Sequence, residues 1–158
     1  MNQNTLEHLN RIIALAIEGE RDAAAFYRSL SDHAAFSAQK ELLESYAEME
    51  EGHAQALSIL QSSGFETLRL KQEETILSLD IHHYLSAPTW DPSRNLTFQD
   101  IIHIAIKREE ASQKLYTDLA REVSSPDAYH LFLHLAQEEA AHKLHFERLY
   151  DQEVLTDN

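Results

Sequence analysis

AIEGERDAAAFY, residues 16–27, is the stretch that decides the fold, because its pattern returns as AIKREEASQKLY at residues 105–116. Both stretches begin with Ala-Ile, carry Glu at the fifth position and end with Tyr. The apolar residues in and around each stretch recur at alternating steps of three and four residues, which is typical of an amphipathic α-helix. A repeated helical segment predicts an all-α protein built from two similar halves.

The repeat extends into a second helix in each half. A Glu-x-x-His motif begins 30 residues after the glutamate of each stretch, and matching positions in the two halves all differ by 89 residues. A duplicated helix hairpin explains this regularity better than coincidence does. The motif residues are Glu20, Glu50 and His53 in the first half, and Glu109, Glu139 and His142 in the second.

Composition supports the same fold class and excludes several functions. The chain has 158 residues, of which 43% are hydrophobic, so we expect one domain over residues 1–158 with a real core. Only 3 Gly and 3 Pro are present, too few for the turns of a many-stranded β-sandwich or barrel. The absence of Cys excludes disulfides, thiolate metal sites and thiol catalysis.

Charge and hydropathy indicate the partners to expect. Against 27 Asp and Glu stand 13 Lys and Arg, for a formal net charge of −14. Such a field repels polyanions, so we expect no nucleic-acid partner and no anionic membrane surface. No apolar run approaches the roughly 18 residues of a membrane span, and the first residues lack a signal-peptide pattern. We expect a cytoplasmic protein.

Capping signals divide the chain into four long helices. The expected helices run from Thr5 to about Ala35, from Ser37 to near Gly64, from Thr97 to about Val123, and from Ser125-Pro126 to about Asp151. Thr97 with Asp100 has the spacing of a capping box. Short turns around Phe36 and Ser124 make each pair of helices an antiparallel hairpin.

A long crossover, about residues 65–96, separates the two hairpins. It contains Pro88, Pro92 and the only tryptophan, Trp90, and its Lys71–Leu85 segment is a candidate short helix. Hairpin, crossover and hairpin together give the topology of a ferritin-like four-helix bundle.

The six repeated ionisable residues interrupt otherwise apolar helix seams. Each glutamate lies about fifteen residues from its turn, which puts all four near the same level, roughly 22 Å along the helices at 1.5 Å per residue. Four buried carboxylates are costly without compensating charge, and two divalent cations would supply +4 against their −4. By symmetry we expect Glu50 and Glu139 to bridge two metals while Glu20 and Glu109 each bind one. Oxygen-rich ligands with imidazoles favour iron, with manganese as the alternative.

Other residues of the same types receive weaker interpretations. Tyr27 and Tyr116 follow their glutamates by seven residues; each is either a core aromatic or a group that hydrogen-bonds a ligating carboxylate or acts in redox chemistry near the metals. Three further acid–histidine pairs with the same spacing are interpreted as surface features: Asp80–His83, Asp100–His103 and Asp127–His130. The histidines interpreted as solvated or capping are His8, His33, His82, His130, His134 and His145.

Over residues 6–152 the doubled motif resembles the rubrerythrin family of the ferritin-like superfamily. The resemblance implies a bundle around a non-haem di-iron centre that reacts with hydrogen peroxide or dioxygen, in peroxidase or ferroxidase chemistry linked to oxidative stress. Two departures matter. Without Cys there is no rubredoxin domain, so an external donor such as a rubredoxin-like protein must supply electrons. Ser112 stands where many relatives have an additional carboxylate, which puts a ligand exchange at that position in doubt.

Three functions are therefore to be compared. The first is a di-iron oxidoreductase that acts on hydrogen peroxide or dioxygen. The second is an iron-binding ferroxidase that stores or delivers iron. Cage-forming ferritins usually add a short fifth helix, and the 16 residues after His142 disfavour such a cage. The third is a purely structural bundle, which buried glutamates disfavour. For any of them we expect a homodimer.

Overall fold

A computed structural model describes residues 1–65, 67–85 and 88–156, and these residues form helices, loops and a single isolated β-bridge. The protein has the predicted all-α class. Its elements in chain order are α1 (Gln3–Ser31), the 3-10 helix η1 (Ala34–Gln39), α2 (Lys40–Ser62), α3 (Glu73–Leu77), α4 (Ile81–Leu85), α5 (Phe98–Glu122) and α6 (Pro126–Thr156).

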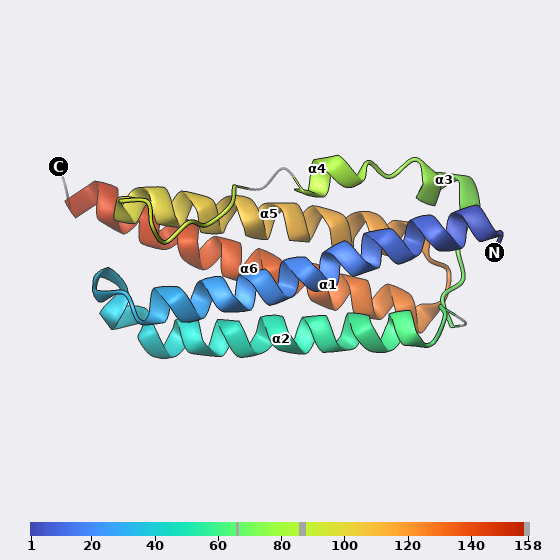
Figure 1. Ribbon diagram of the computed structural model, residues 1–158, viewed down its shortest axis with the longest axis horizontal. Helices are drawn as coiled ribbons and strands as arrows, with labels where there is room; N and C mark the ends of the chain where they lie inside the picture. Colours follow the sequence, from blue (N-terminus) through green and yellow to red (C-terminus); the bar gives the residue numbers. More distant parts are fainter. Residues whose placement is uncertain (66, 86–87, 157–158) are drawn as a thin grey trace. The chain divides into compact units, whose positions relative to one another are not determined.

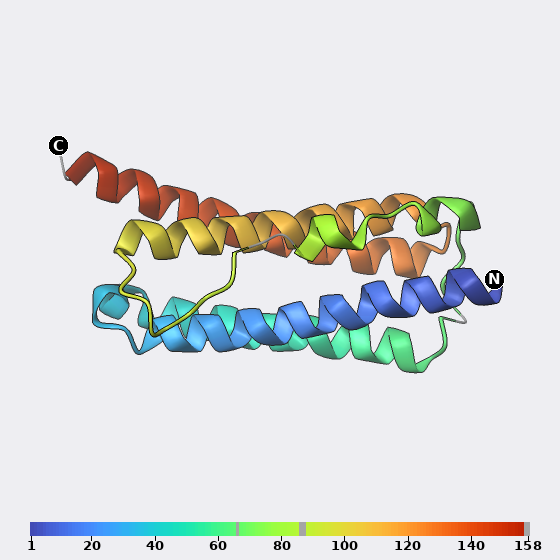
Figure 2. The same ribbon diagram turned by 45° about the horizontal axis from the view of Figure 1, so that its top comes forward.

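The first hairpin pairs α1 with α2, which lie side by side in both Figure 1 and Figure 2. Their direction is antiparallel: Gln61, late in α2, donates to the carbonyl of Asn10, early in α1. Arg28, late in α1, pairs with Glu51 at 2.6 Å. The apolar seam is buried as the periodicity predicts, including Leu9, Ile13, Ala16, Leu30, Leu43, Leu57 and Leu60.

The beginning and end of α1 differ from the sequence prediction. Asn2, rather than Thr5, caps the helix, because the Asn2 side chain accepts a hydrogen bond from the Thr5 amide at 2.9 Å. The helix ends at Ser31, before Ala35. Thr5 is itself fully buried, so its position in the core takes the place of the predicted capping role.

The turn of the first hairpin is also more elaborate than predicted. Ser37 does not open α2; it lies inside η1, and α2 begins at Lys40. Phe36 leaves helical geometry (φ −113°, ψ 18°), and its side chain is fully buried, so an apolar anchor shapes this turn. At the other end, α2 finishes at Ser62, and Gly64 adopts a left-handed φ of 67° that favours glycine after a helix.

The second hairpin joins α5 and α6. The predicted capping box is confirmed, since the Thr97 amide donates to Asp100 at 2.9 Å and the Asp100 amide donates to the Thr97 hydroxyl at 3.1 Å. Ser125 Oγ accepts from the Ala128 amide at 3.4 Å at the start of α6. The α6 helix continues to Thr156, past the predicted end at Asp151, and its last turns extend beyond the start of α5 (Figure 2).

The crossover contains two short helices, α3 and α4, in place of the single helix predicted over Lys71–Leu85. Its first part pairs with the turn of the second hairpin: Leu70 bridges Val123, and the Lys71 amide donates to the Glu122 carbonyl at 2.8 Å. Farther along, Tyr84 donates to Asp118 of α5 at 2.7 Å.

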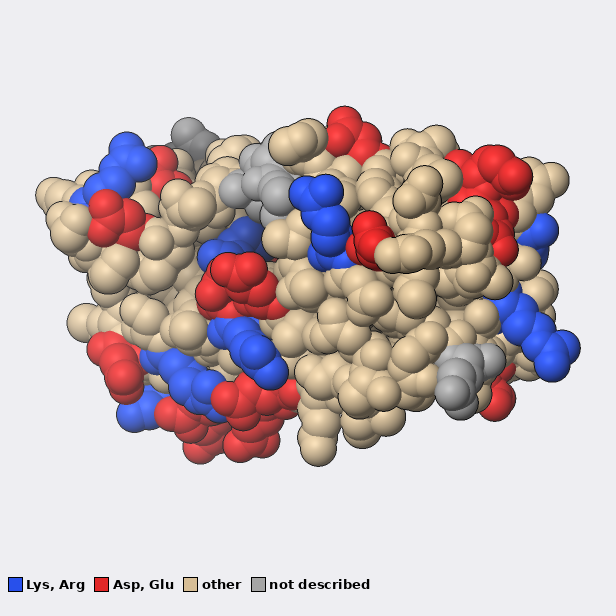
Figure 3. Space-filling view, turned by 45° about the vertical axis from the view of Figure 1, so that its right-hand side comes forward, with Lys and Arg blue, Asp and Glu red and all other residues tan. Residues whose placement is uncertain are grey.

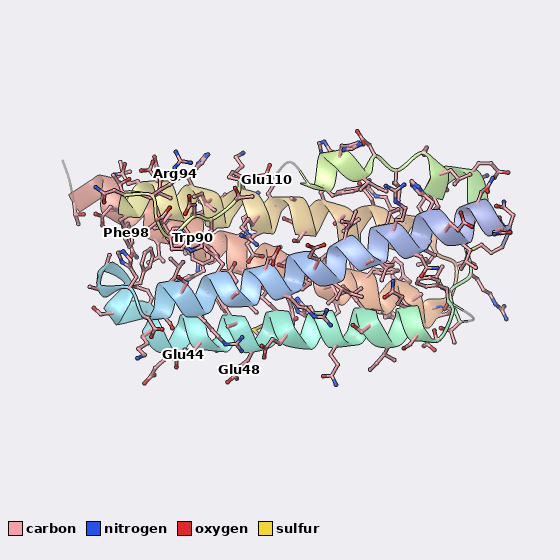
Figure 4. The ribbon with its side chains drawn as sticks, viewed as in Figure 1. Glu44, Glu48, Trp90, Arg94, Phe98 and Glu110 are labelled. Carbon is pink, nitrogen blue, oxygen red and sulfur yellow. The ribbon has the colours of Figure 1, made fainter. Side chains whose placement is uncertain are left out.

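The end of the crossover carries the tryptophan of the chain. Trp90 and Arg94 lie on this last loop, just before Phe98 opens α5 (Figure 4). Trp90 as a whole is partly exposed, whereas its Nε1 atom is buried.

The chain divides into two compact units, Met1–Leu79 with Arg121–Tyr129, and Asp80–Ala120 with His130–Asn158. One domain over residues 1–158 stays a prediction. Among the described residues, no helix is both long and apolar enough to cross a membrane.

Candidate metal centre

The first unit brings together the three predicted ligands of the first half. Glu20 lies in the middle of α1, and Glu50 and His53 share one face of α2 because they are three residues apart. All three side chains are buried, with at most 5% of each residue exposed. His53 Nδ1 lies 3.2 Å from Glu50 Oε2 and 3.6 Å from Glu20 Oε2. We call this group the first half-site.

Burial and neighbouring charge change the proton affinities of the first half-site. Burial, together with the hydrogen bond to Glu50, raises the pKa of Glu20 from 4.5 to about 8, although His53 acts in the opposite direction. For His53, burial lowers the pKa, but hydrogen bonds with Glu20 and Glu50 outweigh burial and raise it to about 11. The Glu20 carboxyl and the His53 imidazole therefore both hold a proton near neutral pH. A metal ion that binds these side chains would displace the protons.

The second unit repeats the arrangement with Glu109 from α5 and with Glu139 and His142 from α6. These three side chains are at most 2% exposed, and His142 Nδ1 lies 3.4 Å from Glu109 Oε1. We call this group the second half-site. The next residue, Glu110, is on the outer side of α5 (Figure 4), where its carboxylate lies 3.5 Å from Lys143 Nζ.

Each half-site has the donor set of a divalent metal ion. One ligand atom from each of its three residues lies within 4.8 Å of the other two. Ligand atoms bound at about 2.0–2.2 Å from one ion lie about 3–4 Å apart, so only small side-chain movements are needed. Two carboxylates with one imidazole suit iron or manganese. Uncompensated carboxylates would be expensive at such burial, which supports a cation as the reason for the group.

Tyr27 and Tyr116 are both in the core, each 1% exposed. The ring of Tyr27 packs against the edge of Tyr46 with centroids 5.9 Å apart. Core packing is therefore established for both tyrosines, and their role beside a metal stays a prediction. Ser112 is partly exposed on α5.

The three acid–histidine pairs interpreted as surface features are indeed on the surface. All six residues, Asp80, His83, Asp100, His103, Asp127 and His130, are exposed. His33 is a capping residue as predicted, since its Nδ1 accepts a hydrogen bond from the Ala35 amide at 3.2 Å. Acid–histidine pairs with the same three-residue spacing are thus buried in two motifs and exposed in three. Only the buried motifs lie on an apolar helix seam.

One local arrangement was missed by sequence reasoning. His134, interpreted as solvated, places Nε2 at 3.1 Å from Oε1 of Glu138. The available signal was a series of four-residue steps that leads along α6 to His142.

In a comparison with known protein families, residues 11–150 match the family described as Rubrerythrin. The chain belongs to the rubrerythrin family. The match covers both hairpins and the crossover, so this rubrerythrin-family chain has the ferritin-like fold class predicted from its doubled motif. The buried carboxylate and histidine groups fit the metal-binding character of that family. No curated protein and no solved structure gives a match.

Proposed function

We propose that the protein binds two iron ions with the ligands of its two half-sites and uses them to reduce hydrogen peroxide or dioxygen. The observation that carries the proposal is the repetition of one buried donor set, two carboxylates and one imidazole, in both units. Glu20, Glu50 and His53 would hold iron in the first half-site, and Glu109, Glu139 and His142 would hold it in the second.

Charge favours two ions. Four carboxylates carry −4, and two ferrous ions carry +4, so the loaded centre is neutral where an empty one must take up protons or bear net charge. The imidazoles of His53 and His142 bind metals in their neutral form. In the metal-free protein, the raised pKa values of Glu20 and His53 favour bound protons, which partly offset the negative charge of the carboxylates.

When bound, two ferrous ions supply one electron each, which with two protons reduces hydrogen peroxide to two molecules of water. The chain's own residues supply position and environment. Apolar side chains on the same helices, such as Ile13, Leu57 and Phe146, are fully buried, and a dry core of this kind limits access of bulk water. Tyr27 and Tyr116 would donate hydrogen bonds to ligating carboxylates and so hold their orientation.

After the reaction, an external donor must supply the electrons that reduce the iron ions again. The 158 residues contain no Cys, so they hold no iron–thiolate centre of the rubredoxin type. We propose a rubredoxin-like protein as the external donor and a homodimer as the functional assembly. The same chemistry with many iron atoms taken up per chain would instead make the protein a ferroxidase that stores or delivers iron.

The test compares Glu50→Ala with Glu44→Ala after anaerobic reconstitution with ferrous ion. Glu44 is an exposed glutamate of the same helix (Figure 4), which makes it the matched control. We expect about two iron ions per chain in the wild type and in the control, and a loss of iron in Glu50→Ala because this change removes one of the two carboxylates of the first half-site. Elemental analysis and Mössbauer spectra measure the count and the coupling of the ions.

Peroxide consumption with a chemical reductant then tests the reaction. The proposal expects turnover in the wild type and in Glu44→Ala, and none in Glu50→Ala. Folded wild-type protein that takes up no ferrous ion contradicts the proposal. Two manganese ions after expression would keep the site and change the metal, and many iron atoms per chain would replace catalysis with storage.

A further inference from the structure

Four residues of α6 follow one another at intervals of four: His130, His134, Glu138 and His142. All four are of types that bind divalent metals. Residues four apart in an α-helix are neighbours on its surface, and two metal ligands at this spacing can bind one ion. Each adjacent pair in the series can therefore bind one ion, and successive pairs share a ligand.

Exposure falls along the series. His130 is exposed, and the side chain of His134 is 64% exposed. The side chain of Glu138 is 26% exposed, and that of His142 is only 1% exposed. The gradual change follows from helix geometry, since each step of four residues turns the side chain by about 40° around the axis. The series thus leads from solvent to the second half-site.

The middle of the series already has metal-ligand geometry. His134 Nε2 and Glu138 Oε1 are 3.1 Å apart. Two ligand atoms bound at right angles about 2.1 Å from one ion are separated by about 3 Å, so an ion could bind both with little movement. Without metal, the same carboxylate fixes the imidazole by direct contact.

The first hairpin lacks such a series. Positions 89 residues earlier hold Glu41, Ser45 and Met49, and only the final position, His53, is again a histidine. The two halves thus share the buried histidine but not the three residues that precede it in the series. A structural requirement of the helix would be expected in both halves, which makes a function of α6 alone the better explanation.

We propose that His134 and Glu138 form a surface site that binds a divalent cation, that His130 is the outer neighbour of this site, and that the series passes ferrous ion to His142. Acidic side chains lie in several groups on the face in Figure 3, and a net charge of −14 attracts cations to the protein as a whole. The transfer exchanges ligands without any change of oxidation state. The destination rests on the function proposed above, whereas binding at the surface does not.

The first measurement is a zinc titration by calorimetry of the full chain. The double variant His130→Gln/His134→Gln removes the surface imidazoles, and His82→Gln/His83→Gln removes two exposed histidines of α4 as the matched control. We expect the wild type and the control to bind one more zinc ion per chain than the double variant. An equal number of zinc ions in all three proteins overturns the surface site.

The second measurement is the rate at which ferrous ion becomes protected from a chromogenic chelator under anaerobic conditions. We expect the double variant to load at least about tenfold more slowly than wild type and to reach the same final iron content, since outer ligands affect metal affinity by about 10–100-fold. Loading at the wild-type rate overturns the entry role. Wild-type protein that protects no iron refutes the di-iron proposal instead, while the zinc titration still decides the surface site.

Discussion

The two hairpins hold the same buried ligands in different surroundings. In the first, the turn carries η1 with Phe36 as a buried anchor; in the second, the turn is short and is fixed by backbone bonds to the crossover. The helices also differ, since α6 carries the exposed series that begins at His130 and α2 does not. The two halves therefore share the buried residues that could bind metal. They differ in the packing of their turns and in the exposed residues that precede the buried histidine.

The turns offer the largest expected difference. Phe36→Ala empties a fully buried position and should cost about 3–5 kcal/mol of unfolding free energy. Ser125→Ala removes one capping hydrogen bond in the other turn and should cost about 1 kcal/mol. Urea unfolding of the metal-free variants measures both free energies. Equal costs would show that the first turn does not depend on its side-chain anchor.

The pH dependence of the metal-free protein tests the first half-site. Glu20 and His53 have pKa values raised to about 8 and about 11, so the folded state binds more protons than the unfolded state. The stability that they contribute is therefore lost as pH rises, between 4.5 and about 8 for Glu20 and between 6.5 and about 11 for His53. We expect Tm of the metal-free protein to fall from pH 6 to pH 9.

Iron should reverse this trend, because metal binding displaces the protons and becomes stronger as pH rises. The difference in Tm between loaded and metal-free protein should thus grow from pH 6 to pH 9. In Glu20→Gln, which removes one titrating group, the metal-free curve should be flatter. A wild-type Tm that rises with pH over this range would contradict the assignment of the protons.

The smallest predicted effect concerns two glycines beside the first half-site. Gly19 and Gly52 lie inside α1 and α2, and a Cβ added at either position meets nothing within 4 Å. The second half has Arg108 and Ala141 at the matching positions. Because glycine weakens a helix interior, each Gly→Ala change should stabilise the protein by about 1 kcal/mol without altering its iron content. Thermal unfolding with metal analysis measures both, and a loss of iron would reveal a need for glycine at the site.

Much of the fold could be predicted because its signals are local or periodic. The positions of Glu20, Glu50 and Glu109 on buried seams follow from helical spacing alone, since a buried face repeats every three or four residues. The capping box at Thr97 was also predictable, because both of its partners lie within one turn. Spacing alone could not distinguish the Glu139–His142 motif from the exposed pair Asp127–His130. The two were distinguished because only the first lies among apolar residues at helical spacing.

The amino-acid sequence by itself determined the all-α class, the two hairpins and the six candidate ligands, because hydrophobic periodicity and duplication are properties of the chain. Only the tertiary structure decided the end of α1 at Ser31, the 3-10 turn around Phe36, and the bridge from Leu70 to Val123. These features depend on contacts between distant residues or on competition for space in the core, which no local pattern records. The raised pKa of Glu20 belongs with them, because burial creates it.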